Sequence, residues 1–235
     1  MLREYCKWSR GNEEIFEMNI TQYAFSYKDA KNWGKKYHEC NGPNQSPISF
    51  APSSGPEGYP EIKEEMRLTD FNTSPKKMSI KNTGHTVEIK ADWNGKRPSC
   101  TGGPLHGNYV FEKATFHWAK KPTGFPNTKH WLDDFSETLH KIRSPNSTAE
   151  IKPFPLLNDF DNAYTSFLFY EGSLDYPPCS ESVTWFIVEY PIHVIDSVLN
   201  EFKKIKLSEG DVSNVRPTQP LNKRELKYVY NHNRH

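Results

Sequence analysis

Residues 102–118 read Gly-Gly-Pro-Leu-His-Gly-Asn-Tyr-Val-Phe-Glu-Lys-Ala-Thr-Phe-His-Trp. If the end of this stretch is a β-strand, Thr115 and His117 point to the same face. Imidazoles at both positions would supply two ligands to one zinc ion, and a histidine from a neighbouring strand would complete a catalytic centre with three protein ligands. The first position is a threonine, so the stretch carries half of a metal site. Function depends on whether the remaining histidines can hold a metal.

Composition sets broad limits on the class of protein. The 235 residues are 35% hydrophobic with a net charge of +1, and the mean hydropathy is −0.82, which describes one globular domain. Thirty basic against 29 acidic residues give no basic field, so nucleic acid is not an expected partner. No apolar run approaches the roughly 20 residues of a membrane span. The polar first ten residues lack a signal-peptide core, so any leader is absent from this numbering.

The cysteines and sequons favour the secretory route. The four cysteines lie far apart and form no CxxC pair, so two long-range disulfides are the economical interpretation, with a cytosolic protein bearing free thiols as the alternative. Glycosylation is expected at three N-x-S/T sequons, and a fourth, at Asn44, is weaker because Gln45-Ser46-Pro47 follows it. The three expected sites are Asn19, Asn72 and Asn146.

Short apolar segments between 18 prolines and 13 glycines favour strands over long helices. Apolar residues alternate on both sides of Asn82-Thr83-Gly84, which predicts a hairpin with one buried face. Residues 183–188 are almost continuously apolar, which suits a strand near the middle of a sheet. A stripe at helical spacing from Ile195 to Ile205 predicts a helix that packs on the sheet.

Many short motifs, in one order from Trp33 to Tyr230, resemble the α-class carbonic anhydrases. The resemblance implies an α+β, β-dominated fold: a large twisted, mostly antiparallel sheet with peripheral helices, here with a central segment deleted. We expect this domain over residues 31–235 and an N-terminal extension over 1–30. The motifs are Trp33-Gly34, Cys40, Gly42, Gln45-Ser46-Pro47-Ile48, Asn82-Thr83-Gly84-His85, Gly102-Gly103-Pro104-Leu105, Phe116-His117-Trp118, Gly172-Ser173-Leu174, Pro177-Pro178, Val183-Thr184-Trp185 and Arg216-Pro217-Thr218-Gln219-Pro220-Leu221.

The resemblance also implies a disulfide between Cys40 and Cys179, as in secreted members of the family. Cys6 and Cys100 then remain as a candidate second bridge, which is our own inference and not a family feature. Both expectations place the protein outside the cell.

The family holds zinc with three histidines, and the metal lowers the pKa of bound water so that hydroxide can attack CO2. The first ligand position falls on Thr115 and the second on His117. The third is expected at His140, where Thr138 and His140 would alternate along a strand. Threonine is a poor zinc ligand, so we expect no resident cofactor, or zinc at reduced affinity.

The groups that orient the zinc hydroxide in the family are also changed. Asp175 replaces the orienting threonine, Tyr176 follows it, and Lys129 replaces the relay glutamate. Asp175 would repel a metal hydroxide, or would itself reach the metal and complete a site with His117 and His140. The alternative is that Asp175 pairs with Lys129 or caps a turn.

His85 matches the position of the family's proton shuttle, and an ordinary imidazole pKa suits that role. A surface residue in the hairpin turn explains His85 equally well.

The expected deletion lies between His140 and Gly172 and removes an apolar central strand. Part of the CO2 pocket should be lost with it, although four positions match the apolar wall: Ile142, Leu174, Val183 and Trp185. Removing a central strand exposes ladder hydrogen-bonding groups. The cover could come from residues 154–157, from residues 164–170, from the N-terminal extension or from a second protomer.

Three hypotheses follow. We expect a secreted pseudoenzyme that has lost CO2 hydration and binds a protein or glycan partner. The alternatives are a zinc-dependent hydratase or esterase with an altered metal site, and a storage or matrix protein that keeps the fold as a scaffold. Because an enzyme needs metal, oriented hydroxide and pocket together, the first hypothesis is favoured.

Overall fold

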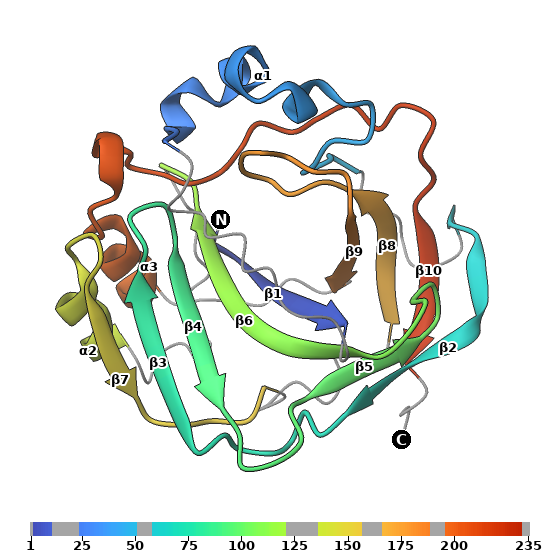
Figure 1. Ribbon diagram of the computed structural model, residues 1–235, viewed down its shortest axis with the longest axis horizontal. Helices are drawn as coiled ribbons and strands as arrows, with labels where there is room; N and C mark the ends of the chain where they lie inside the picture. Colours follow the sequence, from blue (N-terminus) through green and yellow to red (C-terminus); the bar gives the residue numbers. More distant parts are fainter. Residues whose placement is uncertain are drawn as a thin grey trace.

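A ten-stranded sheet organises the chain in the computed structural model (Figure 1). The structure describes residues 2–10, 24–50, 58–120, 136–156, 166–188 and 196–231, with only the backbone of 2–10. The strands are β1 (Leu2–Arg10), β2 (Glu61–Thr69), β3 (Lys77–Asn82), β4 (Val87–Asp92), β5 (Ser99–Gly102), β6 (Tyr109–Trp118), β7 (Thr148–Ile151), β8 (Ser166–Gly172), β9 (Val183–Val188) and β10 (Lys227–Asn231).

The strand order is β7-β3-β4-β6-β5-β2-β10-β8-β9, and β1 pairs with β6 off this path. Among the strands described, β2 and β10 pair in parallel and the other pairs are antiparallel. The predicted β-dominated, mostly antiparallel fold is therefore confirmed.

Short helices lie around the sheet, as expected. They are α1 (Trp33–Lys36), α2 (Ser136–Leu139), α3 (Asp196–Lys203) and the 3-10 helices Tyr27–Asn32, His38–Asn41, His140–Ile142 and Ser208–Gly210. In the part of the chain that the structure describes, no helix has the length and apolar character needed to cross a bilayer.

The hairpin predicted around residues 82–84 is formed by β3 and β4, with Ile80 opposite Ile89. Both side chains are almost completely buried. The predicted amphipathic helix is α3, whose Phe202 ring lies 5.3 Å from the ring of Phe116 and 5.4 Å from that of Trp118. Burying each large apolar side chain stabilises the fold by roughly 1.5–3 kcal/mol. The predicted hairpin and the predicted helix thus pack in the same hydrophobic core.

Strand β6 is paired along both sides. On one side Ile89 of β4 pairs with Ala114 and Cys100 of β5 pairs with Tyr109. On the other side β1 runs antiparallel along the whole of β6, from Leu2 opposite Trp118 to Arg10 opposite Tyr109 (Figure 1). Of the segments expected to cover the deletion, the N-terminal extension lies along β6 through β1. The expected boundary at residue 30 stays a prediction, but β1 belongs to the same sheet as the rest of the chain.

The second disulfide, between Cys6 and Cys100, is contradicted. β1 and β5 lie on opposite sides of β6, so they are separated by two strand spacings, roughly 10 Å. Cys6 pairs with Ala114 whereas Cys100 pairs with Tyr109, which also displaces them along the sheet. A disulfide requires Cα atoms within about 7 Å. Cys100 is a free, buried thiol, and burial raises its pKa to about 12.

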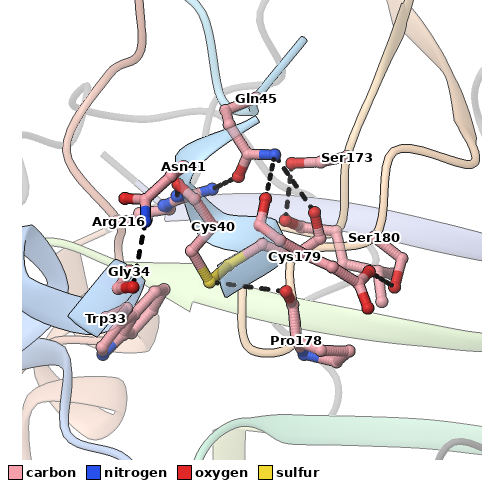
Figure 2. The surroundings of a disulfide bond; sticks show 12 residues. Trp33, Gly34, Cys40, Asn41, Gln45, Ser173, Pro178, Cys179, Ser180 and Arg216 are labelled. Carbon is pink, nitrogen blue, oxygen red and sulfur yellow. Dashed lines mark hydrogen bonds between the residues drawn. A yellow bond between two sulfur atoms is a disulfide. The ribbon is translucent and has the colours of Figure 1, made fainter. Parts of the chain in front are cut away.

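The disulfide between Cys40 and Cys179 is confirmed (Figure 2). It joins the 3-10 helix His38–Asn41 to the loop that follows β8, across 139 residues of sequence. Closing so long a loop removes much conformational entropy from the unfolded chain. Gln45 supports the junction, because its Nε2 donates to the carbonyls of Glu39 and Cys179. The bridge therefore fixes the loop that carries Asp175.

The strand predicted over residues 183–188 exists as β9, but its predicted place near the middle of the sheet is wrong. β9 ends the strand order, and among the described residues it pairs with β8 alone. Its apolar pattern has another cause, since both faces pack: Phe186 lies 6.0 Å from the ring of Phe169, and Trp185 stacks 6.4 Å from Tyr170. A continuous apolar run indicates that both faces of a strand pack against other residues. It does not indicate that the strand lies in the middle of the sheet.

Candidate functional site

One face of β6 carries the residues predicted to bind metal. Lys113, Thr115 and His117 alternate along the strand and so point to one face. Glu88 of β4 is the cross-strand partner of Thr115, and residues in such pairs share a face. Thr115 is half-buried and the other three are buried. We call this set, together with Asp175, the β6 face.

His117 is held firmly. The residue is 2% exposed, and its Nδ1 lies 2.8 Å from the carbonyl oxygen of Asn214. A carbonyl can only accept, so Nδ1 carries the proton and Nε2 keeps the lone pair that a metal would use. The side chain of Asn214 also bonds the backbone of Phe116 and Trp118 at 2.8 Å each, which locks β6 in place. Sequence reasoning missed Asn214, whose only signal was its position two residues before the Arg216 motif.

Asp175 lies on the wrong side of that imidazole to share a metal with it. Its Oδ2 is 3.5 Å from Nδ1 of His117, the nitrogen that already bonds Asn214. Asp175 is 5% exposed, and its charge raises the pKa of Arg216 against the lowering by burial. The structure thus brings Asp175 to His117 as predicted, but as a neighbour of Nδ1 rather than of Nε2. Pairing with Lys129 falls outside the described residues.

His140 does not reach the β6 face by the route predicted for it. Residues 138–140 were expected to alternate along a strand, and this is wrong: Thr138 lies in α2 and His140 begins the 3-10 helix His140–Ile142. His140 is exposed on that helix, which contacts β3 and β7. A strand period applied to a helical segment assigns side chains to the wrong faces.

The strands beside β6 place no histidine opposite Thr115 or His117. Glu88 of β4 and Tyr5 of β1 stand opposite Thr115, and Arg3 of β1 stands opposite His117. Among the residues that the structure describes, no three His, Cys, Asp or Glu side chains are grouped so that they could hold a metal ion.

A buried ion pair occupies the β6 face beside Thr115. Nζ of Lys113 donates to Oε1 of Glu88 at 2.6 Å, and the side chains are 11% and 8% exposed. The pair neutralises the carboxylate of Glu88, the cross-strand partner of Thr115. Sequence reasoning missed it because the pair depends on the register between β4 and β6, although the alternation of Lys113 with Thr115 was readable in the sequence.

Tyr176 adds a neutral hydroxyl to this region. Burial raises its pKa, and the carboxylates of Asp175, Glu88 and Glu112 raise it further, so the phenol stays protonated at neutral pH. The ring packs against the aromatic cluster around Phe25 and Trp33.

The four residues expected to form the apolar pocket wall do not share one core cluster. Ile142 is completely buried in the core cluster that contains α3 and β6, whereas Trp185 packs against the separate cluster around Leu168 and Tyr228. Leu174 and Val183 are half-buried outside both clusters. Ile142 lies elsewhere because it belongs to a helical turn whose backbone oxygen accepts from Asn82.

His85 is buried, so the interpretation as a surface turn residue is wrong. The ring is 7% exposed and stacks on Phe25 at a centroid distance of 4.2 Å. Its buried Nδ1 has no hydrogen-bond partner among the described residues. Burial lowers the pKa of His85, and the charges of Asp211 and Glu209 offset part of this shift.

The lowered pKa of His85 predicts an acid-sensitive contribution to stability. A histidine that is harder to protonate when folded stabilises the protein above its unfolded pKa, about 6.5, and this contribution is lost as the pH falls toward the folded pKa. We expect the free energy of unfolding to drop between pH 7.5 and pH 5, and to drop less in His85→Asn. Urea titrations at both pH values measure this, with His38→Asn at an exposed histidine as the control. An equal drop in wild type and His85→Asn would contradict the assignment.

Comparison with known proteins decides the family. The family model of the eukaryotic-type carbonic anhydrases matches residues 28–133 and 122–230. The chain belongs to this family. Carbonic anhydrase 7 of Mus musculus is 27% identical to it, over 83% of this chain and 92% of that protein. Receptor-type tyrosine-protein phosphatase zeta of Homo sapiens is 26% identical over 84% of this chain, which corresponds to 11% of the phosphatase.

The carbonic anhydrase match comes in two pieces that meet within residues 122–133. The deletion was expected between His140 and Gly172, whereas the two matched ranges overlap before α2.

A zinc ion of the carbonic anhydrase type does not fit the residues described at the β6 face. His117 offers one imidazole nitrogen, Thr115 offers a neutral hydroxyl, and Asp175 faces the opposite nitrogen of the ring. Catalytic zinc sites use three protein ligands around an open position. Residues 121–135, which include Lys129 and His130, lie outside the described part of the chain.

Proposed function

We propose that this member of the carbonic anhydrase family has lost CO2 hydration and acts outside the cell as a binding or structural module for a protein or glycan partner. The observation that carries the proposal is the donor set of the β6 face, where Thr115 stands beside His117 and the carboxylate of Asp175 lies at Nδ1 of that histidine.

The ion pair supports the same conclusion. Hydration requires a metal-bound hydroxide in a cavity whose dipoles are arranged for it. Lys113 and Glu88 instead fill the space beside Thr115 with a salt bridge at 2.6 Å. A cation at this position repels a metal ion, and its carboxylate partner is already neutralised.

The location and partner class rest on separate observations. The buried Cys40–Cys179 bridge agrees with an oxidising compartment. The sequon asparagines Asn72 and Asn146 are exposed, which agrees with glycosylation, while Asn19 lies outside the described residues. A segment similar to this chain also occurs in a protein named as a receptor-type phosphatase. The fold is therefore used in proteins whose names describe a receptor.

One observation favours the alternative, a hydratase with an altered zinc site. The bond from Nδ1 of His117 to the Asn214 carbonyl is the outer-shell arrangement that orients a metal-ligating histidine. With a rearranged Asp175 and a ligand from residues 121–135, a metal site would be complete.

Metal analysis and CO2 hydration of the native protein separate the two functions. We expect less than stoichiometric zinc and hydration at the buffer rate. In Thr115→His, a second imidazole beside His117 should raise zinc affinity at least tenfold, since each ligand contributes strongly, while hydration stays at the buffer rate. Thr69→His, on the exposed part of β2, controls for nonspecific binding. One zinc per native chain with measurable hydration would overturn the proposal.

A further inference from the structure

A small cavity lies beside the disulfide, and its lining contains no residue of β6. It has a volume of about 270 Å³ and is formed by the segment from Ala30 to Gly42 and by residues 216–219. Its polar lining consists of Lys31, Asn41, Arg216 and Gln219, and none of the described residues that line it is acidic. Figure 2 shows Arg216 and Asn41 close to Cys40 in this region.

Arg216 is the unusual member of this lining, because it is 5% exposed and incompletely bonded. Its Nη1 donates to Oε1 of Gln45 at 2.8 Å and to the carbonyl of Ser46 at 2.9 Å, and its Nη2 donates to the carbonyl of Cys40 at 3.2 Å. The buried Nε has no hydrogen-bond partner among the described residues. A guanidinium has five N–H donors, so the hydrogen-bonding capacity of Arg216 is only partly used.

The charge of Arg216 is also poorly neutralised at short range. The three acceptors are an amide and two carbonyls, and none of them is a carboxylate. Asp175 acts on Arg216 through its field without a hydrogen bond. The ring of Trp33 lies 5.6 Å from the guanidinium carbon and gives a weaker cation–π contact. A buried cation without a bonded counterion is costly, and an anion that entered the cavity would lower this cost.

We propose that this cavity binds a small oxyanion, a carboxylate or a phosphate group, between Arg216 and Lys31. The volume lies just below the roughly 300 Å³ at which ordinary small-molecule sites begin, which suits a single anionic group. Lys31 adds a second positive charge at the exposed rim, and the amides of Asn41 and Gln219 add neutral hydrogen-bonding groups. Arginine is the side chain best matched to planar or tetrahedral oxyanions.

The geometry of the cavity depends on Gly34. A Cβ atom at this position would collide with the side chain of Asn41, whose Nδ2 donates to the Gly34 carbonyl at 2.9 Å. The glycine thus lets the carboxamide of Asn41 lie along the backbone at the edge of the cavity. Anion binding in this cavity does not depend on whether the β6 face is catalytic. The proposal can therefore be tested independently of the proposed function.

Titration with sodium phosphate and with sodium acetate tests the proposal on the full chain. Thermal unfolding and calorimetry are compared with sodium chloride at equal ionic strength. We expect at least one of the two oxyanions to raise the unfolding temperature beyond the chloride control. Phosphate alone indicates a phosphate-type group, and acetate indicates a carboxylate.

Variants locate the anion. Lys31→Gln should weaken binding at least threefold, whereas Lys35→Gln, which removes the same charge from an exposed lysine outside the cavity, should leave it unchanged. Arg216→Gln should abolish binding if circular dichroism shows a folded protein; Lys31→Gln keeps the test valid if it does not fold. No effect beyond chloride, or equal weakening in Lys31→Gln and Lys35→Gln, would overturn the proposal.

Discussion

Removal of residues 1–10 is expected to abolish the stable folded monomer. β1 pairs with β6 at nine positions from Leu2 to Arg10. At roughly 0.5–1.5 kcal/mol per hydrogen bond, the loss approaches the roughly 5–15 kcal/mol of total stability of a typical domain. The truncated chain would also expose the edge of a long strand whose side chains Phe111 and Phe116 are fully buried, and such an edge recruits other chains. Size-exclusion chromatography and urea titration should show aggregation or early unfolding.

A backbone substitution tests the same pairing without shortening the chain. Successive N–H groups of a strand point to opposite sides, so prolines at both Glu4 and Tyr5 must remove one that faces β6. We expect Glu4→Pro/Tyr5→Pro to resemble the truncation and Glu4→Thr/Tyr5→Thr, which keeps strand propensity, to resemble the wild type. If the truncated protein stays monomeric with an unchanged urea midpoint, β1 is dispensable and the assignment of its role is wrong.

Replacing Lys113 by methionine is expected to cost roughly 3–5 kcal/mol, because it leaves the buried carboxylate of Glu88 without its partner. The double variant Lys113→Met/Glu88→Leu should recover to within about 1 kcal/mol of the wild type or exceed it, since a buried pair often gains little over apolar residues of similar volume. Urea titrations of the four proteins give the coupling energy.

The exposed pair of Lys204 and Glu201 provides the matched control. Its N–O distance is also 2.6 Å, but the Lys204 side chain is 51% exposed. Lys204→Met should therefore cost at most about 1 kcal/mol. Equal costs in Lys113→Met and Lys204→Met would show that the β6 face is far more hydrated than its burial indicates, and would remove the ion pair as support for the loss of hydration activity.

Local patterns predicted the local parts of the fold well. The alternation around residues 82–84 led to β3 and β4, and the stripe ending at Ile205 led to α3, because each pattern reports the packing of its own element. The disulfide between Cys40 and Cys179 came from the resemblance, not from a pattern. For β9, the apolar run predicted the strand but not its position in the sheet.

Two features missed at the site depend on pairing between distant segments, and such pairing leaves little trace in either sequence. No sequence pattern in residues 2–10 indicates that they pair with residues 109–118. The strand beside His117 could therefore not be predicted. His140 was predicted as a ligand from an alternating strand pattern over residues 138–140, but this segment is helical. The pair of Lys113 and Glu88 needed the register between β4 and β6.

The partnership of β1 with β6 also bears on how the protein is made. The two strands are separated by roughly a hundred residues of sequence, and contacts of such long range slow folding. During synthesis, β1 leaves the ribosome long before β6 is translated. At a translation rate of roughly 5–20 residues per second, β1 stays unpaired for several seconds. Nascent chains of this protein should therefore depend on chaperones until residue 118 has emerged.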